Sequence, residues 1–363
     1  MTSASISSLQ SPNGPPRVTI IIPTYNRDNL LETCLAHLAQ QTFQSFRIVV
    51  VDNGARDAIP PALEAIPRLR WIPLFRNRGT ATAFNRGLAE ARQTPFVFLL
   101  NNDAELEDDC LLRLVQALEE NPGYSVAVPK LLQWSDPARL DGAGDEVLLG
   151  GGAYRVGRGD LDGSRYDKAE PVLSACGAAA LFRRSLFDDV GEFDEDFFAY
   201  REDVDLCLRA QLRGHRCIYV PQARARHRGS ATLGSTFHPQ IMRLTTRNQL
   251  LVLAKNYPAS VLFVLLPRII IFQILWMGLA LKEGAFLSSC SGLLGALPML
   301  LKTLVKRRRI MDTKLLSSGE MLEKLRESER RIWRWHSSVR NGHPSKLLTA
   351  YFWIFGSPHT TQT

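Results

Sequence analysis

The fold is decided by the stretch VTIIIPTYN at residues 18–26, in which a run of apolar and β-branched residues ends abruptly in Pro, Thr, Tyr and Asn. Two further runs have the same form, namely Ile48–Val51 before Asp52 and Phe96–Leu100 before Asn101. Unbroken runs of this length are typical of strands that are buried on both faces of a sheet. The sequence therefore predicts three buried strands, each followed by polar residues.

Helical patterns lie between the predicted strands. One covers Leu30–Gln41, and another covers Asp109–Glu120 with its apolar residues on one face. Between these two, apolar residues recur at spacings of three and four: Ala81, Phe84, Leu88 and Ala91. Strands that alternate with helices indicate an α/β fold, with a mostly parallel sheet flanked by helices on both sides.

Polar clusters follow all three predicted strands: Pro23-Thr24-Tyr25-Asn26, Asp52-Asn53 and Asn101-Asn102-Asp103. Ligands of open α/β sheets bind at the carboxyl ends of the strands. Such residues are also ordinary turn formers, but three clusters at equivalent places favour one shared site. The sequence has no GxGxxG after the first strand and no GxxxxGK[ST], which disfavours a classical dinucleotide site and a P-loop.

A pair of carboxylates, Glu202 and Asp203, stands at the predicted start of a helix, where the helix dipole favours negative charge. Apolar residues recur every four positions after the pair and are followed by a glycine that predicts the helix end: Val204, Leu208, Leu212 and Gly214. We expect Asp205 and Arg209, four residues apart, to form a pair on the surface of this helix.

Two further features stay open at the level of sequence. The glycine-rich segment 141–165 is either a loop that closes over a substrate or a mere connection. His227, which follows a predicted strand at Cys217–Val220, is either a structural residue or a metal ligand.

Composition and charge narrow the class of protein. The chain has 363 residues, of which 45% are hydrophobic and 22% charged, and this composition excludes global disorder. Six scattered cysteines without a CxxC pair argue against a zinc cluster or a disulfide framework and indicate a reducing compartment. We find no signal-peptide pattern at the N-terminus and therefore expect a cytosolic location.

The basic residues are concentrated at the end of the chain. Residues 301–363 contain 13 Lys or Arg and five Asp or Glu, a surplus equal to the formal net charge of +8. The balanced remainder is not a nucleic-acid surface. A basic tail next to apolar segments instead indicates an anionic membrane as partner.

The apolar segment Ala259–Leu281 is long enough to span a bilayer, although Pro267-Arg268 interrupts it, and Ala285–Leu301 is shorter. The cationic cluster Lys306–Arg309 follows. The two segments form either a hairpin across or into the membrane or helices that lie in its interface. We favour peripheral or monotopic binding over a soluble core. Leu315–His336 is expected to be a charged helix whose Trp333 and Trp335 are interface anchors or oligomer contacts.

These motifs together resemble the inverting family 2 glycosyltransferases, which have the GT-A fold, a Rossmann-like α/β fold. The resemblance extends from Val18 to Tyr257, and the branch that is most similar comprises bacterial rhamnosyltransferases of cell-surface polysaccharide synthesis. The stretches that carry it are VTIIIPTYNR, VVVDN, FRNRGTATAFNRGL, FLLNNDAEL, GAAALFRRSLFDDVGEFDEDFFAYREDVDLCLRAQLRGH and VPQARARHRGSAT.

The resemblance implies a role for each matching residue. Pro23, Thr24, Tyr25 and Asn26 would line the nucleotide pocket, and Asp52 would accept a hydrogen bond from the ring N–H of a uracil or thymine. Residues along the nucleotide and diphosphate would be Arg76, Asn77 and Asn85, and Asn102 would meet the ribose. Metal ligands would be Asp103 and His227. Asp203 matches the catalytic base, with Glu202 as the alternative base.

The metal motif departs from the family pattern. In the family this motif is commonly DxD, whereas the sequence here is Asn101-Asn102-Asp103. A neutral amide binds a hard cation less strongly than a carboxylate. We still expect Mg²⁺ or Mn²⁺, with the diphosphate supplying further oxygens.

The resemblance implies transfer of a sugar, such as rhamnose from dTDP-rhamnose, to a lipid-linked or polysaccharide acceptor at the cytoplasmic face of the cell membrane. Two alternatives are another UDP- or dTDP-hexose as donor and an inactive nucleotide-sugar-binding scaffold. The oligomeric state stays open. We expect a disordered segment 1–16, a catalytic GT-A domain 17–257, apolar membrane-associated helices 258–312 and a basic helical tail 313–363.

Overall fold

A computed structural model describes residues 14–26, 28–54, 56, 59–64, 66, 68–229, 235, 237–338 and 345–358. Residues 1–13, most of the segment expected to be disordered, lie outside the described residues.

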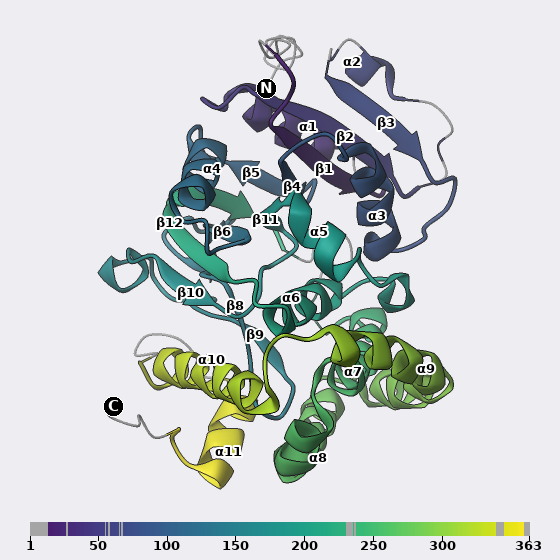
Figure 1. Ribbon diagram of the computed structural model, residues 1–363, viewed down its shortest axis with the longest axis vertical. Helices are drawn as coiled ribbons and strands as arrows, with labels where there is room; N and C mark the ends of the chain where they lie inside the picture. The colour runs from purple at the N-terminus through teal and green to yellow at the C-terminus, as the bar shows by residue number, and fades with distance from the viewer. Residues whose placement is uncertain are drawn as a thin grey trace.

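The centre of the molecule is a ten-stranded mixed sheet (Figure 1). Its main path runs in the order β10-β12-β6-β11-β4-β1-β2-β3. The strands on this path are β1 (Val18–Thr24), β2 (Phe46–Asp52), β3 (Leu69–Pro73), β4 (Phe96–Leu100), β6 (Val126–Gln133), β10 (Glu170–Val172), β11 (Ala179–Arg183) and β12 (Cys217–His227). Two short strands join its side, β5 (Ala104–Leu106) beside β12 and β7 (Leu140–Gly142) beside β6.

The three predicted strands are adjacent members of this sheet. β1 pairs in parallel with β2 on one side and with β4 on the other, and β3 extends the parallel group beyond β2. β11 is antiparallel to both of its neighbours, β4 and β6. The α/β prediction is therefore confirmed, while β11 and the short antiparallel strands β5, β7 and β10 were not predicted.

Helices cover both faces of the sheet, because the strand residues are apolar on both sides and form two separate core clusters. The helices of this part of the chain are α1 (Asp28–Ala39), α2 (Pro61–Glu64), α3 (Thr80–Glu90), α4 (Cys110–Glu120), α5 (Arg184–Val190) and α6 (Glu202–Leu212), with short 3₁₀ turns η2 (Ser164–Tyr166) and η3 (Glu195–Phe197). The predicted stripe from Ala81 to Ala91 is buried against β1 and β2.

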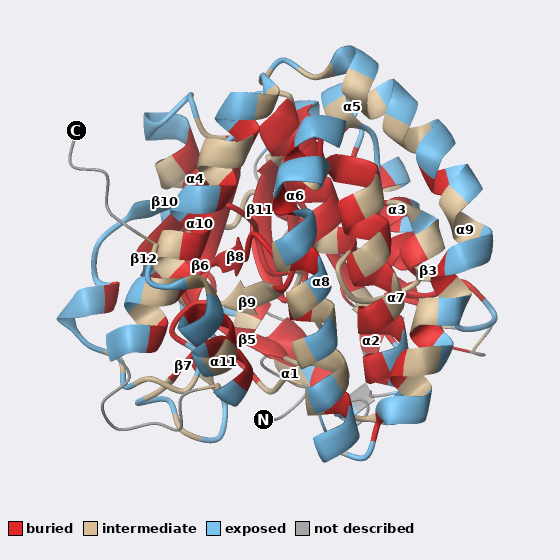
Figure 2. Ribbon diagram, turned by 90° about the horizontal axis from the view of Figure 1, so that it is seen from below, coloured by how far each residue is buried: buried red, intermediate tan, exposed pale blue. Residues whose placement is uncertain are grey.

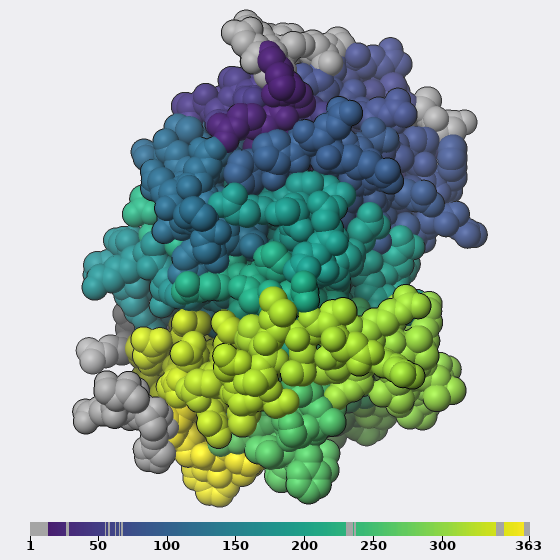
Figure 3. Space-filling model, viewed as in Figure 1, coloured from purple at the N-terminus to yellow at the C-terminus, as the bar shows by residue number. Residues whose placement is uncertain are grey.

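Five more helices gather at the end of the molecule that lies opposite β1–β3 (Figures 1 and 3). They are α7 (Pro239–Asn256), α8 (Ala259–Lys282), α9 (Phe286–Thr313), α10 (Ser318–Ser338) and α11 (Lys346–Phe355). Among the described residues, α8 and α9 are long and apolar enough to cross a membrane, judged by length and composition alone. Much of the outward surface of α9 is exposed (Figure 2).

The glycine-rich segment 141–165 is packed rather than free. It contains β7 and a hairpin of β8 (Asp145–Val147) with β9 (Ala153–Arg155). The turn of the hairpin lies against Phe272 of α8, and a Cβ atom on Gly152 would stand 2.3 Å from Cζ of that ring. Glycine is therefore required at this close approach, and the segment is a connection fixed between the sheet and the C-terminal helices.

Three expectations about the C-terminal half need correction. Asp205 and Arg209 do form a pair, but they are 0% and 5% exposed rather than on the surface, because α7 covers α6. Trp333 and Trp335 pack within the chain, the former with its ring centroid 4.9 Å from that of Phe352. Residues 306–309 do not present four free cations, since Lys306 and Arg307 bond to other parts of the chain.

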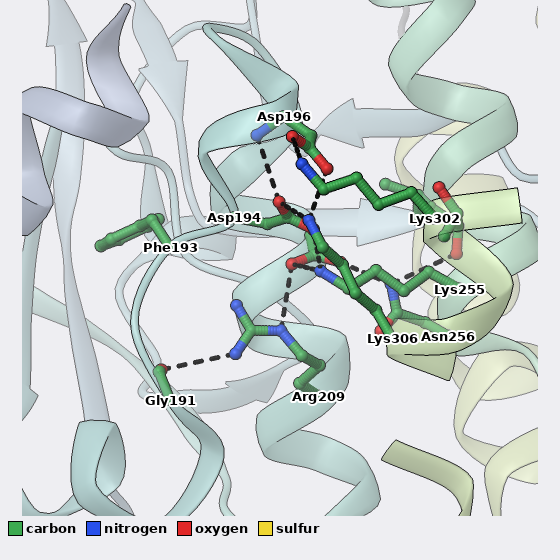
Figure 4. A network of polar contacts seen from close by, with 12 residues as sticks. Gly191, Phe193, Asp194, Asp196, Arg209, Lys255, Asn256, Lys302 and Lys306 are labelled. Carbon is green, nitrogen blue, oxygen red and sulfur yellow. Dashed lines mark hydrogen bonds and ion pairs between the residues drawn. The ribbon is translucent and has the colours of Figure 1, made fainter. Parts of the chain in front are cut away.

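A buried polar network joins α6, α7 and α9 (Figure 4). Lys255 Nζ donates to Asp194 Oδ2 at 2.7 Å and to Asp205 Oδ2 at 2.8 Å. Burial by itself would raise the pKa of Asp205, but the charges of Lys255 and Arg209 outweigh it and lower that pKa. The stabilisation is therefore present above the ordinary carboxyl pKa and is lost as the pH falls.

Replacing Lys255 by Met is expected to lower the free energy of unfolding by about 3 kcal/mol, because it removes the cation shared by two buried carboxylates. Lys302→Met is the matched control. Lys302 pairs with Asp196 while 64% of its side chain stays exposed, so its removal should cost less than about 1 kcal/mol. Denaturant unfolding at neutral pH measures both values. Equal costs would contradict the role assigned to Lys255.

Candidate active site

Thr24 joins the carboxyl ends of three parallel strands. It is the register partner of Asp52, and its carbonyl oxygen accepts a hydrogen bond from Asn53 N at 2.8 Å. Its hydroxyl accepts a hydrogen bond from Asn102 Nδ2 at 2.9 Å. The polar residues that follow β1, β2 and β4 are thereby brought together at one edge of the sheet, which we call the donor edge: Thr24, Asp52, Asn53 and Asn102.

Asp52 is fully buried at this edge. Its Oδ1 accepts from Gly54 N at 2.9 Å, and its Oδ2 accepts from Arg56 Nε at 3.0 Å. A carboxylate has about four acceptor positions, so these bonds leave capacity for a further donor such as a base N–H. The partners fix the direction of the carboxylate.

Most of the remaining residues expected at the nucleotide lie nearby. Pro23 belongs to β1, and Tyr25 and Asn26 follow it as exposed residues. Asn77 Oδ1 accepts from Gly79 N at 2.9 Å and from Asn53 Nδ2 at 3.2 Å, which ties its loop to the donor edge. Arg76 precedes it as an exposed residue.

Asn85 has a different place. Its Nδ2 donates to the carbonyl oxygen of Phe193 at 2.9 Å and to Glu195 Oε1 at 3.1 Å, and its Oδ1 accepts from Phe193 N at 3.0 Å. Both ends of the amide are therefore committed to the segment 193–195, and the contacts of Asn85 are those of a residue that holds this segment in place.

His227 lies between two carboxylates. Its Nε2 is 3.3 Å from Asp103 Oδ1, and its Nδ1 is 2.7 Å from Asp141 Oδ2. Burial lowers the pKa of His227, but the two carboxylates outweigh burial and raise that pKa to about 9. Asp141 was missed in the sequence because it is 86 residues away from His227. The only signal for it was its position in the glycine-rich segment.

A divalent cation fits Asp103 and His227 by the chemistry of the donor atoms. Carboxylate oxygen and imidazole nitrogen are both ligands of Mn²⁺-type ions. Two ligands of one octahedral ion, each about 2.1 Å from it, stand about 3 Å apart, close to the separation of Asp103 Oδ1 and His227 Nε2. A carboxylate on the second histidine nitrogen is also the usual partner of a metal-bound histidine.

A second group of possible ligands consists of Asp145, Cys176 and Asp203, whose ligand atoms lie within 4.8 Å of one another. The guanidinium of Arg155 donates to Cys176 Sγ at 2.6 Å, and its Nε is 3.5 Å from Asp145 Oδ1. Positive charge is thus already supplied at this group. A cation bound at this group would have to compete with Arg155.

The carboxylate pair begins α6, as predicted. Asp203 Oδ2 accepts from Gly177 N at 2.9 Å, and the next residue, Ala178, accepts Asn101 N at its carbonyl oxygen, also at 2.9 Å. Asp203 is therefore two hydrogen bonds away from the Asn101-Asn102-Asp103 stretch. The segment 175–178 brings the pair to the same edge of the sheet as the donor-edge residues.

Glu202 differs from Asp203 in its surroundings. It is only 6% exposed, and its Oε2 has no hydrogen-bond partner among the described residues. Burial, together with the charge of Asp203, raises the pKa of Glu202 to about 8. A carboxyl group with a raised pKa is mostly protonated at neutral pH, and this sets the surroundings of Glu202 apart from those of Asp203.

The strand ends of this α/β sheet thus gather a buried Asp, an Asp–His pair and a helix-borne carboxylate. Residues 19–191 match the family model of glycosyl transferase family 2. This stretch is a family 2 glycosyltransferase domain, and the protein is a glycosyltransferase.

Curated relatives are similar to the chain over its N-terminal part. The N-acetylglucosaminyl-diphospho-decaprenol L-rhamnosyltransferase of Mycobacterium tuberculosis is 28% identical over 237 residues, which cover 59% of this chain and 77% of the relative. The O-antigen biosynthesis protein RfbC of Myxococcus xanthus is 28% identical over 232 residues, which cover 60% of this chain but only 18% of that protein.

Among solved structures, GalNAc-T7 with UDP, GalNAc and Mn²⁺ superposes with a TM-score of 0.55 at 14% sequence identity. The superposition covers 73% of this chain and 52% of the other. At this identity the likeness concerns the fold alone, and it identifies the fold as GT-A.

Glu202→Gln is expected to stabilise the folded protein at high pH. The pKa of Glu202 rises from 4.5 to about 8 on folding, so its contribution is complete below pH 4.5 and is lost as the pH rises through 8. The variant should exceed the wild type at pH 9 by a few kcal/mol, on the order of the free energy that such a shift represents.

Denaturant unfolding of both proteins at pH 5 and pH 9 measures this difference. We expect similar stabilities at pH 5. A difference between the two proteins that does not change from pH 5 to pH 9 would contradict the assignment of a protonated Glu202.

Proposed function

We propose that the protein is an inverting glycosyltransferase in which Asp203 is the catalytic base. The observation that carries this proposal is the hydrogen bond from Gly177 N to Asp203 Oδ2, which holds a carboxylate near the end of β4, the strand that leads to Asp103. An acceptor hydroxyl must lose its proton as it attacks the anomeric carbon, and a fixed carboxylate within reach accelerates this step.

The donor would lie along the donor edge. Asp52 would accept a hydrogen bond from the N–H of a pyrimidine base, and Asn102, which Thr24 orients, would meet the ribose. Arg76 and Asn77 would lie along the diphosphate. A bound Mg²⁺ or Mn²⁺ would be held by Asp103 and His227, and it would supply positive charge for the diphosphate.

In the transfer itself, one bond forms and one breaks at the anomeric carbon. The acceptor oxygen bonds to that carbon while the bond to the leaving diphosphate oxygen breaks, and the acceptor proton passes to Asp203. Attack from the face opposite the leaving group inverts the configuration. The nucleoside diphosphate departs with the bonding electrons.

The proposed donor is dTDP-rhamnose, from which rhamnose is transferred. The proposed acceptor is a lipid-linked saccharide. The support is the similarity to a rhamnosyltransferase that is named for a diphospho-decaprenol acceptor. The buried Asp52 suits the ring N–H of thymine or uracil.

We further propose that the catalytic part, residues 17–257, works at the cytoplasmic face of the membrane, with the helices of 258–312 lying in the interface and the basic segment 313–363 beside them. One side of α8 packs on the protein through Val261, Leu265 and Phe272. Its Arg268 is paired with Glu329 at 2.8 Å.

The other side of the two apolar helices is exposed. Phe263 and Leu287 are each 81% exposed. Further apolar side chains on α8 and α9 are more than half exposed: Val264, Ile274, Leu294, Leu297 and Leu301. A helix with one side on protein and one apolar side in contact with solvent suits a monotopic position. Arg308 and Arg309, both exposed, would meet anionic headgroups.

Asp203→Asn is expected to lower the turnover number about 10²–10⁴-fold, since it removes the proton acceptor. Binding of the donor, measured as a thermal shift with dTDP-rhamnose and Mn²⁺, should persist. Glu202→Gln is the matched comparison and should keep most of its turnover. Release of dTDP in the presence of acceptor measures the reaction.

Two outcomes would contradict the proposal. Wild-type turnover in Asp203→Asn would show that the base is another group. If the wild type binds no pyrimidine nucleotide sugar, the proposed activity is wrong.

The double variant Phe263→Ser, Leu287→Ser is expected to bind vesicles that contain anionic phospholipid at least about tenfold more weakly, because two large apolar side chains no longer enter the bilayer. Leu161→Ser is the control, as Leu161 is 52% exposed but lies outside α8 and α9. Vesicle cosedimentation measures binding. An equal loss in the control would count against this membrane surface.

A further inference from the structure

The backbone that leads into the carboxylate pair has an unusual conformation. Phe198, Tyr200 and Arg201 have φ angles of +64°, +69° and +72°, and none of them is glycine. Side-chain-bearing residues adopt this left-handed region at a cost in free energy, and such residues persist only where their surroundings hold them. We call residues 197–201 the entry loop, because Glu202 and Asp203 follow it directly.

A buried side chain of α7 binds most of this loop. Asn248 is completely buried, and the two N–H groups of its Nδ2 are shared among three carbonyl oxygens of the entry loop, those of Phe197 at 2.9 Å, Ala199 at 2.9 Å and Tyr200 at 2.6 Å. The bonds need a donor group, which an amide provides and a carboxylate of the same shape does not.

The neighbouring residue fixes the orientation of this amide. Arg247 Nε donates to Asn248 Oδ1 at 2.9 Å, which leaves Nδ2 directed at the loop. Its guanidinium also donates to the carbonyl oxygens of Asp196 at 3.0 Å and Phe197 at 2.8 Å. Two consecutive residues of α7 therefore bind the carbonyl groups of four of the five residues 196–200.

The opposite side of the entry loop contacts the residues next to the donor edge. The carbonyl oxygen of Phe198 accepts from Ala81 N at 3.2 Å. It would stand 2.3 Å from a Cβ atom on Gly79, whose own φ is +88°. The loop thus packs against Gly79 and the first turn of α3, which begins three residues after Asn77, and we expect a change in the loop backbone to move the start of α6 relative to that edge.

We propose that Asn248 is a positioning residue for Asp203. It acts through the backbone of the entry loop, and it sets the distance and direction of the Asp203 carboxylate relative to the bound donor. This inference rests on the proposed function, in which Asp203 is the base. Residue 248 lies outside the stretch that matches the family model. Among the described residues, its side-chain hydrogen bonds reach none of those proposed to bind nucleotide or metal.

The test uses Asn248→Asp and Asn248→Ala in the full chain, with steady-state kinetics for donor and acceptor. We expect the turnover number to fall at least tenfold in both variants, while the KM of the donor and the thermal shift with nucleotide and Mn²⁺ stay within about twofold. A residue that only supports the fold would lower stability and nucleotide binding together.

Gln249→Met is the matched control on the same helix. Gln249 is also buried, but its side-chain polar atoms have no hydrogen-bond partner among the described residues. Its turnover number should stay within about twofold of the wild type. A loss equal to that of Asn248→Ala would assign the effect to α7 as a whole and overturn the proposal.

The decisive measurement is a double-mutant cycle with Asp203→Asn. If Asn248 acts through Asp203, then Asn248→Asp should lower the residual turnover of Asp203→Asn by less than about threefold, although it costs tenfold or more alone. If the double variant loses turnover by the product of the two single losses, the inference is wrong. Where Asn248→Asp fails to fold, Arg247→Lys takes its place in the cycle, since it removes the Nε donor that orients the amide.

The two levels of the argument fail differently. A wild-type turnover in Asp203→Asn would overturn the proposed base and the positioning role together. A large loss in Asp203→Asn combined with multiplying losses in the cycle would leave the base in place and overturn only the role of Asn248.

Discussion

The structure depends on the buried cation of Lys255, which lies between Asp194 before the entry loop and Asp205 on α6 (Figure 4). Lys255 is the cation that these two carboxylates share, and pairing offsets the cost of desolvating them. Through this residue α7 is attached both to the segment that leads to the carboxylate pair and to the helix that carries it. Lys306 of α9 binds Asp194 and Asp196 from the other side.

The sequence predicted what depends on local periodicity. The strands at Val18, Ile48 and Phe96 and the stripe from Ala81 to Ala91 were found because burial on both faces or on one helix face leaves a repeating pattern. The short antiparallel strand β11 and the full length of β12 were not predicted, since their pairing partners lie far away in the chain. Asp205 and Arg209 were placed on the surface because no local pattern reveals that α7 covers them.

The same limit applies to the site. Residues that follow predicted strands, such as Asp52 and Asn102, could be placed at one edge because parallel strands end together. Asp141 and Asn248 could not, as they reach His227 and the entry loop from 86 and about 50 positions away. Asn85 was placed on the nucleotide by resemblance, whereas its amide bonds to the segment 193–195. Sequence motifs identify side chains that meet a ligand more readily than those that hold other parts of the protein.

The C-terminal helices bind the catalytic part through charged side chains and carry an apolar surface on their other side. Lys306 and Arg307 are directed inward, to Asp194, Asp196 and the backbone of residues 254 and 257, while the apolar side chains of α8 and α9 are directed outward. An anchor that only attached the enzyme to a membrane would have no need of buried ion pairs with the catalytic part. Because the pairs are buried, separating the helices from the α/β part would leave Asp194 without Lys255 and Lys306, and Asp205 with Arg209 alone. The geometry of the carboxylate pair and the position of the apolar surface are thus fixed relative to each other, which is what the proposed transfer to a lipid-linked acceptor would require.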